Sequence, residues 1–331
     1  MAAAAGYDDF ETLLVTWASE GVLSVMINRP ERSNAMNGTF WIECRDCFAR
    51  VRTDNDVRAA VVFAAGRNFT AGLDLQDPGG HSDPGQKDVG RKAYAMHDSI
   101  LEVHQASFNS IEDCAKPVII ATHGACIGGG IDMMCACDIR MCTADAKFCI
   151  KEVDVGLAAD VGTLQRLPKI VGNDSKVREL AYTARVFMAE EAQSIGLVGD
   201  VHPDQESMMA AAFEMATLIA SKSPLAVSGT KRNLVYARDH TVAEGLEYVA
   251  TWVRLIAASV PHLAWHSAPA NNVWLSWTER SHAPVARHDG QHASLPQEGW
   301  EPACVQAAGG REQQQPPQAI MRGNCVYAYR R

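Results

Sequence analysis

Two short and almost uniformly apolar stretches, residues 57–65 and 117–123, constrain the fold most strongly. Runs of this kind are typical of strands that are buried on both faces of a parallel sheet. Helical spacing of apolar residues is expected at 39–51 and at 92–111, and the glycines at 128–130 are expected to open another helix. Strands that alternate with helices predict an α/β core.

Other segments complete this prediction. Further strands are expected at 13–17, 22–28, 138–143 and 147–150. Beyond residue 161 the pattern is helical, and 198–202 alone resembles a strand; the expected helices are 163–170, 175–183, 189–195, 205–221, 224–238 and 242–258. A polar stretch at 79–90 is expected to be mobile.

Composition divides the chain into four parts. A leader at 1–9 precedes an α/β core at 10–200 and a helical region at 201–259 that could serve as an oligomer contact. The remaining residues, 260–331, hold seven of the 14 prolines and four of the seven tryptophans but no lysine. They show no sustained periodicity, so we expect a poorly ordered tail, of a kind that a shifted reading frame can also produce.

Charge and targeting signals exclude some classes of protein. The formal net charge of -9 argues against a general nucleic-acid surface or an anionic-membrane surface. No apolar run reaches the roughly 18 residues that a membrane span needs, so no membrane insertion is expected. The first residues lack the basic and apolar regions of a secretory signal, which makes a cytoplasmic location the default expectation.

The ten cysteines lie mostly within apolar segments. Cys44 and Cys47 form a CxxC pair, but no second pair has zinc spacing. We therefore interpret the cysteines as small buried hydrophobic residues of a reduced protein and predict no metal site.

Three acids suggest acid/base chemistry. Asp132 follows the glycines at 128–130, and Glu152 and Asp160 lie 20 and 28 residues further on, in apolar surroundings. Each acid also has a structural interpretation: Asp132 could be stabilised by a helix dipole, Glu152 could end a strand, and Asp160 could be a helix N-cap. His123, at the expected end of a strand, is interpreted as structural.

Four segments, in this order and spacing, resemble the crotonase (enoyl-CoA hydratase/isomerase) superfamily. They are NRPERSNAMN at 28–37, FTAGLDL at 69–75, HGACIGGGIDMMCACDIR at 123–140 and KEVDVGLAADVGTLQRLP at 151–168. The resemblance covers roughly residues 10–258. It implies an α/β spiral of repeated ββα units with a helical C-terminal region.

Within this superfamily the chain looks like members that shift the double bonds of a 3,5-dienoyl-CoA to the 2,4-positions in unsaturated fatty-acid β-oxidation. Resembling hydratases have glutamates at positions 132 and 152 and a glycine at 160, whereas this chain has Asp132, Glu152 and Asp160. The resemblance implies that Glu152 removes the proton at C2, that Asp160 protonates C6, and that Asp132 assists.

The same resemblance implies the remaining site residues. The backbone N–H groups of Ala71 and Gly129 would form an oxyanion hole, in which they stabilise negative charge on the thioester oxygen. Lys231 is a weaker candidate for coenzyme A binding. The expected substrate-binding residues are Arg32, Ala35, Met36, Gly72, Leu73, Asp74 and Gly128.

An acyl-CoA substrate, no separate cofactor, and a homotrimer or dimer of trimers are also implied. Relatives of this kind work in mitochondria or peroxisome-like organelles, so the location stays open. Two alternatives remain: an enoyl-CoA hydratase or delta(3)-delta(2)-enoyl-CoA isomerase, and a non-catalytic homologue that binds RNA or protein. Asp160 argues against the first, and the net acidity and the complete acid set argue against the second.

Overall fold

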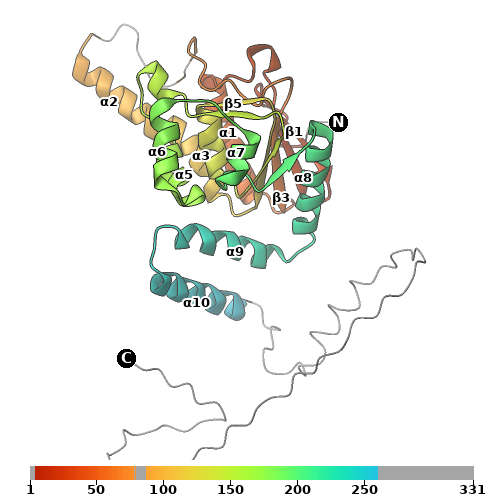
Figure 1. Ribbon diagram of the computed structural model, residues 1–331. Helices are drawn as coiled ribbons and strands as arrows, with labels where there is room; N and C mark the ends of the chain where they lie inside the picture. The colour runs from red at the N-terminus through yellow and green to blue at the C-terminus, as the bar shows by residue number, and fades with distance from the viewer. Residues whose placement is uncertain (1–3, 78, 80–86, 260–331) are drawn as a thin grey trace, which may run out of the picture. The chain divides into compact units, whose positions relative to one another are not determined.

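The computed structural model describes residues 4–77, 79 and 87–259 (Figure 1). The chain divides into one unit of residues 1–263 and a second of residues 264–331, and the second lies outside the described residues. The tail predicted at 260–331 and most of the polar stretch at 79–90 therefore also lie outside them.

A six-stranded sheet forms the centre of the first unit. Its spatial order is β1 (Leu13–Ser19), β2 (Val22–Ile27), β3 (Ala59–Ala64), β4 (Val118–Thr122), β6 (Ile139–Thr143) and β9 (Asp200–His202). β1 and β2 form an antiparallel hairpin, and the other neighbouring strands are parallel. The two apolar stretches are β3 and β4, side by side in the sheet, which confirms the predicted α/β core.

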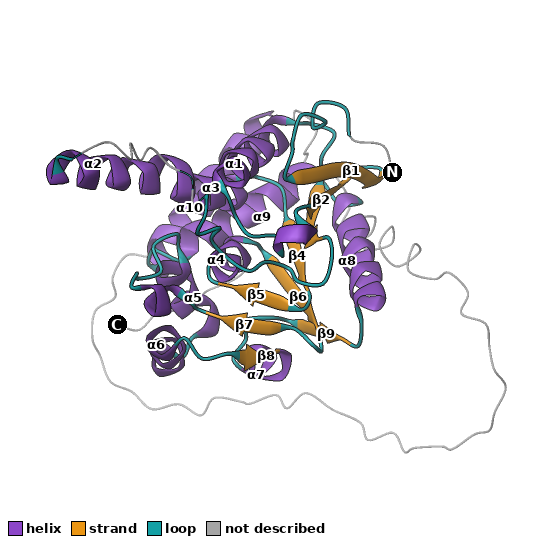
Figure 2. Ribbon diagram, turned by 90° about the horizontal axis from the view of Figure 1, so that it is seen from above, coloured by secondary structure: helices purple, strands orange, loops and turns teal. Residues whose placement is uncertain are grey.

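Both faces of this sheet are buried, as the apolar runs predict. Val22, Val61 and Ile119 face one hydrophobic cluster, on which helix α8 (Gln205–Ala220) packs. Leu23 and Val62 belong to a larger cluster on the other side, together with residues of α1 (Gly38–Thr53) and α3 (Ala106–Asp113). Figure 2 shows α8 on one side of the strands and α1 and α3 on the other.

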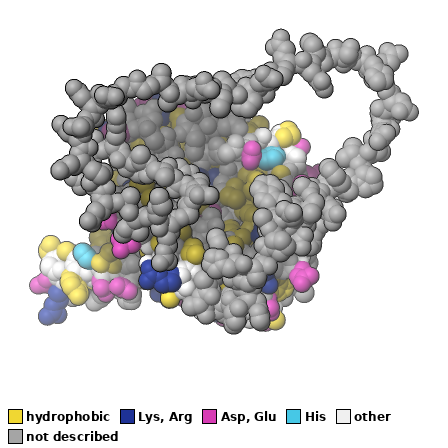
Figure 3. All heavy atoms as spheres, turned by 90° about the horizontal axis from the view of Figure 1, so that it is seen from below, with side chains coloured by type: hydrophobic (Ala, Val, Ile, Leu, Met, Phe, Trp, Pro, Cys, Tyr) yellow, Lys and Arg dark blue, Asp and Glu magenta, His cyan; other side chains and the backbone are white. Residues whose placement is uncertain are grey.

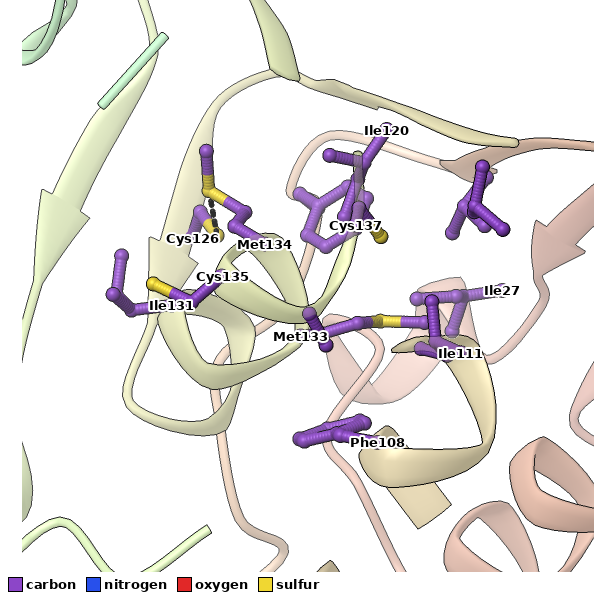
Figure 4. Packing of buried hydrophobic residues seen from close by; sticks show 14 of the residues in the cluster. Ile27, Phe108, Ile111, Ile120, Cys126, Ile131, Met133, Met134, Cys135 and Cys137 are labelled. Atoms are coloured by element: carbon purple, nitrogen blue, oxygen red, sulfur yellow. Dashed lines mark hydrogen bonds between the residues drawn. The ribbon is translucent and has the colours of Figure 1, made fainter. Parts of the chain in front are cut away.

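A smaller sheet adjoins the glycine turn and consists of β5 (Ala125–Ile127), β7 (Lys147–Cys149) and β8 (Phe187–Met188). The sequence did not predict β8, because two residues are too few for a readable alternation. After β5 the chain enters α4 (Gly129–Ala136), whose residues from Gly130 onward are all buried. Met133, Met134 and Cys135 of this helix contribute to the core shown in Figure 4.

The remaining helices have these bounds: η1 (Pro30–Arg32), α2 (Val89–Ser99), η2 (Ile100–Gln105), η3 (Glu152–Val155), α5 (Thr163–Val171), α6 (Asp174–Thr183), α7 (Ala189–Ser194), α9 (Pro224–Ala237) and α10 (Val242–Ser259). The helix predicted at 92–111 is α2, η2 and α3 in succession, with a π-helical turn at η2. In the part of the chain that the structure describes, none of these helices is both long and apolar enough to span a membrane.

Two local features concern the N-terminal residues and the cysteines. Within the expected leader, Ala4 and Tyr7 are buried in the core, and the Ala4 N–H donates to the Val15 carbonyl at 2.8 Å. All eight cysteines among the described residues are buried free thiols. Burial raises the pKa of the Cys44 thiol to about 12, which agrees with the interpretation as a small hydrophobic residue.

Candidate active site

The glycines at 128–130 lie where the chain leaves β5 and enters α4, and their neighbours leave no room for side chains. A Cβ on Gly130 would lie 2.5 Å from Cγ2 of Thr70, and a Cβ on Gly128 would lie 3.2 Å from Oε1 of Glu152. Gly128 also has a φ of +52°, in the region that favours glycine. The turn therefore brings the start of α4 close to Glu152.

A cavity of about 770 Å³ opens beside this turn. It brings together all three predicted acids and both segments of the predicted oxyanion hole. Its walls come from the loop after β3, from α2 and η2, from the start of α4 and from the segment around η3. The walls include Ala71, Gly72, Leu73, His104, Gly128, Gly129, Asp132, Lys151, Glu152 and Asp160.

Asp132 is the most deeply buried of the acids, at 1% exposure. Its Oδ1 accepts a hydrogen bond of 2.6 Å from the backbone N–H of Thr163, the first residue of α5. Burial raises the pKa of Asp132 to about 6, although the hydrogen bonds from Thr163 act in the opposite direction. Asp132 thus interacts with a helix N-terminus, as its structural interpretation suggested. It lies in the first turn of α4 and also contacts the start of α5, 31 residues further along the chain.

Glu152 begins the η3 turn and is half-buried against Gly128. Among the described residues, no group donates a hydrogen bond to its buried Oε2. Burial raises the pKa of Glu152 to about 7, and the negative charges of Asp132 and Asp160 add to the effect. A carboxyl group of this kind takes up and releases protons near neutral pH.

Asp160 is held by the π-helical turn. The side-chain amide of Gln105 donates to the Asp160 carbonyl at 2.7 Å, and His104 lines the same cavity. Burial raises the pKa of the Asp160 carboxyl, and a positive charge on His104 would act in the opposite direction. The N-cap alternative is wrong, because α5 is capped by Gly162 without a side-chain hydrogen bond.

The oxyanion prediction needs a correction at Ala71. Its N–H already donates to the Ser33 carbonyl at 2.9 Å. Two further bonds follow in the same ladder: the Met36 N–H donates to the Gly72 carbonyl at 2.8 Å, and the Asp74 N–H donates to the Met36 carbonyl at 3.0 Å. This pattern alternates, as in parallel strands, so the intervening amide points to the opposite side.

That amide belongs to Leu73, which lines the cavity. Within the described residues its N–H has no acceptor. Gly129, also in the cavity wall, is the first residue of α4, where a backbone N–H has no partner inside the helix. Leu73 and Gly129 therefore fit an oxyanion hole better than Ala71 and Gly129.

The other predicted binding residues divide into two groups. Gly72, Leu73 and Gly128 line the cavity, whereas the described cavity wall does not include the following four: Arg32, Ala35, Met36 and Asp74. Arg32 is exposed and donates to the Gln76 side chain at 2.7 Å. The Arg32 guanidinium also lies 3.6 Å from the Asp74 carboxylate, so its charge is partly balanced within the protein.

Lys231 and His123 have structural roles. Lys231 is 5% exposed, donates to the Ile111 and Lys116 carbonyls at 3.0 Å each, and pairs with Asp138 at 2.8 Å. The weaker proposal of coenzyme A binding by Lys231 is therefore wrong. The His123 ring nitrogen Nε2 lies 2.9 Å from the Gly66 carbonyl, and His123 is not part of the described cavity wall, which agrees with the structural interpretation.

Sequence reasoning missed Gln105 and His104, which lie about 55 residues before Asp160. Nothing in their helical spacing distinguishes them, because the π-helical turn that places them has no sequence signature. Across the described ranges, no group of three or more His, Cys, Asp or Glu residues has the arrangement of a metal site.

Comparison with known proteins defines the class of protein. The family model for enoyl-CoA hydratase/isomerase matches residues 18–255, and the chain belongs to this family. Its relatives include the mitochondrial Delta(3,5)-Delta(2,4)-dienoyl-CoA isomerases of Homo sapiens and Rattus norvegicus. These are 55% and 54% identical to this chain, over 73% and 74% of it and over 74% and 75% of their own length.

More distant relatives extend the comparison. The peroxisomal Delta(3,5)-Delta(2,4)-dienoyl-CoA isomerase of Arabidopsis thaliana is 44% identical, over 70% of this chain and 83% of its own. Among solved structures, that of a putative enoyl-CoA hydratase from Thermobifida fusca YX in complex with acetoacetyl-CoA matches with a TM-score of 0.66. It is 27% identical and covers 78% of this chain and 100% of its own. These matches confirm the predicted superfamily and fold.

Proposed function

We propose that this protein is a Delta(3,5)-Delta(2,4)-dienoyl-CoA isomerase, which converts a 3,5-dienoyl-CoA to its 2,4-isomer in fatty-acid β-oxidation. The isomerases among its relatives, at 44–55% identity, support this activity. The observation that carries the proposal is the set of three carboxyl groups with raised pKa values in one cavity. A shift of two double bonds needs a base at C2 and an acid at C6, and one carboxyl group cannot easily reach both carbons.

Glu152 is the proposed base. Its carboxylate removes the proton from C2, and the electrons of the broken C–H bond move into the conjugated system as a dienolate. Because the pKa of Glu152 is raised to about 7, a large fraction of the carboxylate is ionised at neutral pH and is still basic enough to accept this proton.

The Leu73 and Gly129 N–H groups are the proposed oxyanion donors. The negative charge of the dienolate develops on the thioester oxygen, and fixed N–H donors stabilise such a charge strongly in a dry cavity. Gly129 contributes in addition the favourable dipole of the α4 N-terminus.

Asp160 is the proposed acid at C6. An apolar acyl chain in the cavity would displace water from its carboxyl group and raise its pKa further, which favours the protonated form. Transfer of this proton to C6 completes the 2,4-diene and leaves Asp160 ionised and Glu152 protonated. The negative charge of Asp132 raises the pKa of Glu152, and that of Asp160 raises the pKa of Asp132. Asp132 is therefore proposed to assist electrostatically, and its hydrogen bond with the Thr163 N–H at the start of α5 holds it in place.

The quaternary structure is a second part of the proposal. Leu218, Leu225, Leu234 and Leu246 of α8, α9 and α10 are more than half exposed. Viewed from below, the described surface carries hydrophobic side chains among acidic and basic ones (Figure 3). We infer that residues 201–259 form a homotrimer or a dimer of trimers; a stable monomer in light scattering would contradict this.

One assay tests the activity. The full chain is incubated with a 3,5-dienoyl-CoA, and the absorbance of the conjugated 2,4-product is followed. Conjugation is expected, and it should be lost in Glu152→Gln but kept in Asp154→Asn, whose exposed carboxylate pairs with Lys151. Hydration without conjugation would indicate a hydratase instead, and no reaction with any enoyl-CoA would indicate a non-catalytic homologue.

A further inference from the structure

A cluster of ion pairs joins two loops of the chain. Arg29 and Arg32 lie in the loop after β2, and Asp74 lies in the loop after β3, next to the proposed oxyanion donor Leu73. Asp74 is 4% exposed, and its Oδ2 lies 3.3 Å from the Arg29 guanidinium. Its Oδ1 lies 3.6 Å from Arg32 and accepts a hydrogen bond of 3.1 Å from the Gln76 N–H. A buried carboxylate with this many partners is held in one orientation.

Arg29 connects Asp74 to the neighbouring loop. The same guanidinium donates to the Ala35 carbonyl, and the Arg29 backbone N–H donates to the Asn34 side chain at 2.8 Å. Asn34 in turn donates to the carbonyls of Ala65 and Asn68, at 2.7 and 2.9 Å. The Arg29 guanidinium can contact Asp74 and the Ala35 carbonyl simultaneously because its donors form a rigid planar fork.

The cluster surrounds the backbone ladder that orients Leu73. Met36 exchanges two hydrogen bonds with Gly72 and Asp74, so the peptide between them is fixed on both sides. Displacement of either loop would rotate the Leu73 N–H relative to the Gly129 N–H. A misplacement of about 1 Å can cost about 100-fold in rate, because the charge-stabilising donors must meet a single oxygen position.

We propose that Arg29 and Asp74 are positioning residues, whose ion pair holds the Leu73 N–H in the orientation that polarises the thioester oxygen. This inference rests on the proposed function for its substrate, but it concerns residues that do not line the described cavity.

The charge state of the pair is suited to this role. Burial alone would raise the pKa of Asp74, but the hydrogen bonds from Gln76 and Arg29 lower it below its ordinary value. The carboxylate therefore stays ionised throughout the neutral range. Asp74→Asn removes this charge and conserves the shape of the side chain.

The test measures polarisation of the ligand separately from turnover. Full-length wild type, Asp74→Asn and Arg29→Lys are each saturated with a 2,4-dienoyl-CoA, and the absorbance maximum of the bound diene is recorded. Oxyanion donors polarise the carbonyl and shift this maximum to longer wavelength. We expect a smaller red shift in both variants, together with a loss in kcat of about 10- to 100-fold and an unchanged KM.

Asp9→Asn is the matched control, since Asp9 and Arg50 form an ion pair of similar type that is largely exposed and apart from the cavity. It should leave the red shift and kcat at wild-type values. Circular dichroism and thermal melting report the folded fraction of each variant, and Arg29→Lys carries the test if Asp74→Asn does not fold.

A wild-type red shift and kcat in folded Arg29→Lys or Asp74→Asn would overturn the inference. A fall in kcat with an unchanged red shift would also overturn it, because the pair would then act elsewhere. If wild type shows no isomerisation but its red shift depends on Asp74, the positioning role stands and the proposed reaction fails.

Discussion

Replacement of Glu152 by glutamine is expected to stabilise the protein above neutral pH while it abolishes turnover. The folded protein raises the pKa of this carboxyl from 4.5 to about 7, mainly because burial disfavours its ionised form. Above pH 7 the wild type must therefore keep an unfavourable charge in the cavity. Glutamine has nearly the same shape and carries no charge.

The magnitude follows from the difference between the two pKa values. At about 1.4 kcal/mol for each unit, a rise from 4.5 to about 7 corresponds to an upper bound of about 3.5 kcal/mol. Between these two values the folded state binds more protons than the unfolded state, so the stability of the wild type falls as the pH rises. The advantage of Glu152→Gln should thus be near zero below pH 4.5 and complete at pH 8. Because Glu152 is partly solvated, the measured value should lie below the bound.

Urea denaturation of the wild type and Glu152→Gln at pH 5 and pH 8, without ligand, measures the difference in their free energies of unfolding. Asp154→Asn is the matched control in the same η3 turn, and the exposed ion pair with Lys151 that it removes should contribute little to stability at either pH. Turnover of Glu152→Gln should fall by at least about 100-fold, and wild-type kcat/KM should rise with pH through about 7, because kcat/KM reports the ionisation of the enzyme without substrate. Equal effects of Glu152→Gln at both pH values, or destabilisation at pH 8, would refute the reasoning.

Three further changes have defined outcomes. Asp160→Asn should remove the acid at C6 and lower kcat by about 100-fold or more, with a melting temperature at pH 8 equal to or above that of the wild type, because burial also disfavours the Asp160 charge; near-normal absorbance kinetics would count against the role. Asp132→Ala should leave the buried Thr163 N–H without its acceptor and cost about 1–3 kcal/mol in urea denaturation, and an unaltered midpoint would argue against this contact. Gly130→Ala should destabilise by about 1–3 kcal/mol, because its Cβ would lie 2.5 Å from the Thr70 side chain; a stabilised variant would contradict this packing.

The fold could be predicted in large part because its signals are local. The apolar runs that became β3 and β4 are visible in the sequence, and burial on both faces requires that lack of alternation. β8 was missed because its two residues are ordered by pairing with β7, and the single helix expected at 92–111 did not reveal the π-helical turn. Both features depend on contacts with distant segments.

The candidate site divides in the same way. Asp132, Glu152 and Asp160 could be selected by residue type and spacing, and the structure brings them to one cavity. The free amide could not be selected: Ala71 and Leu73 occupy the same loop, and only the register against Met36 determines which N–H is left without an acceptor. A register shift of one residue reverses the direction of every amide along such a ladder.

The sequence alone therefore determined the α/β class, the family and the three acids, because these depend on side-chain chemistry and on spacing along the chain. The tertiary structure alone decided that Asp132 accepts from the start of α5, that Gln105 holds Asp160, and that Asp74 is paired with Arg29. The physical reason is that a hydrogen-bond partner is chosen by distance in space. Each of these partners lies 31 to 55 residues away along the chain.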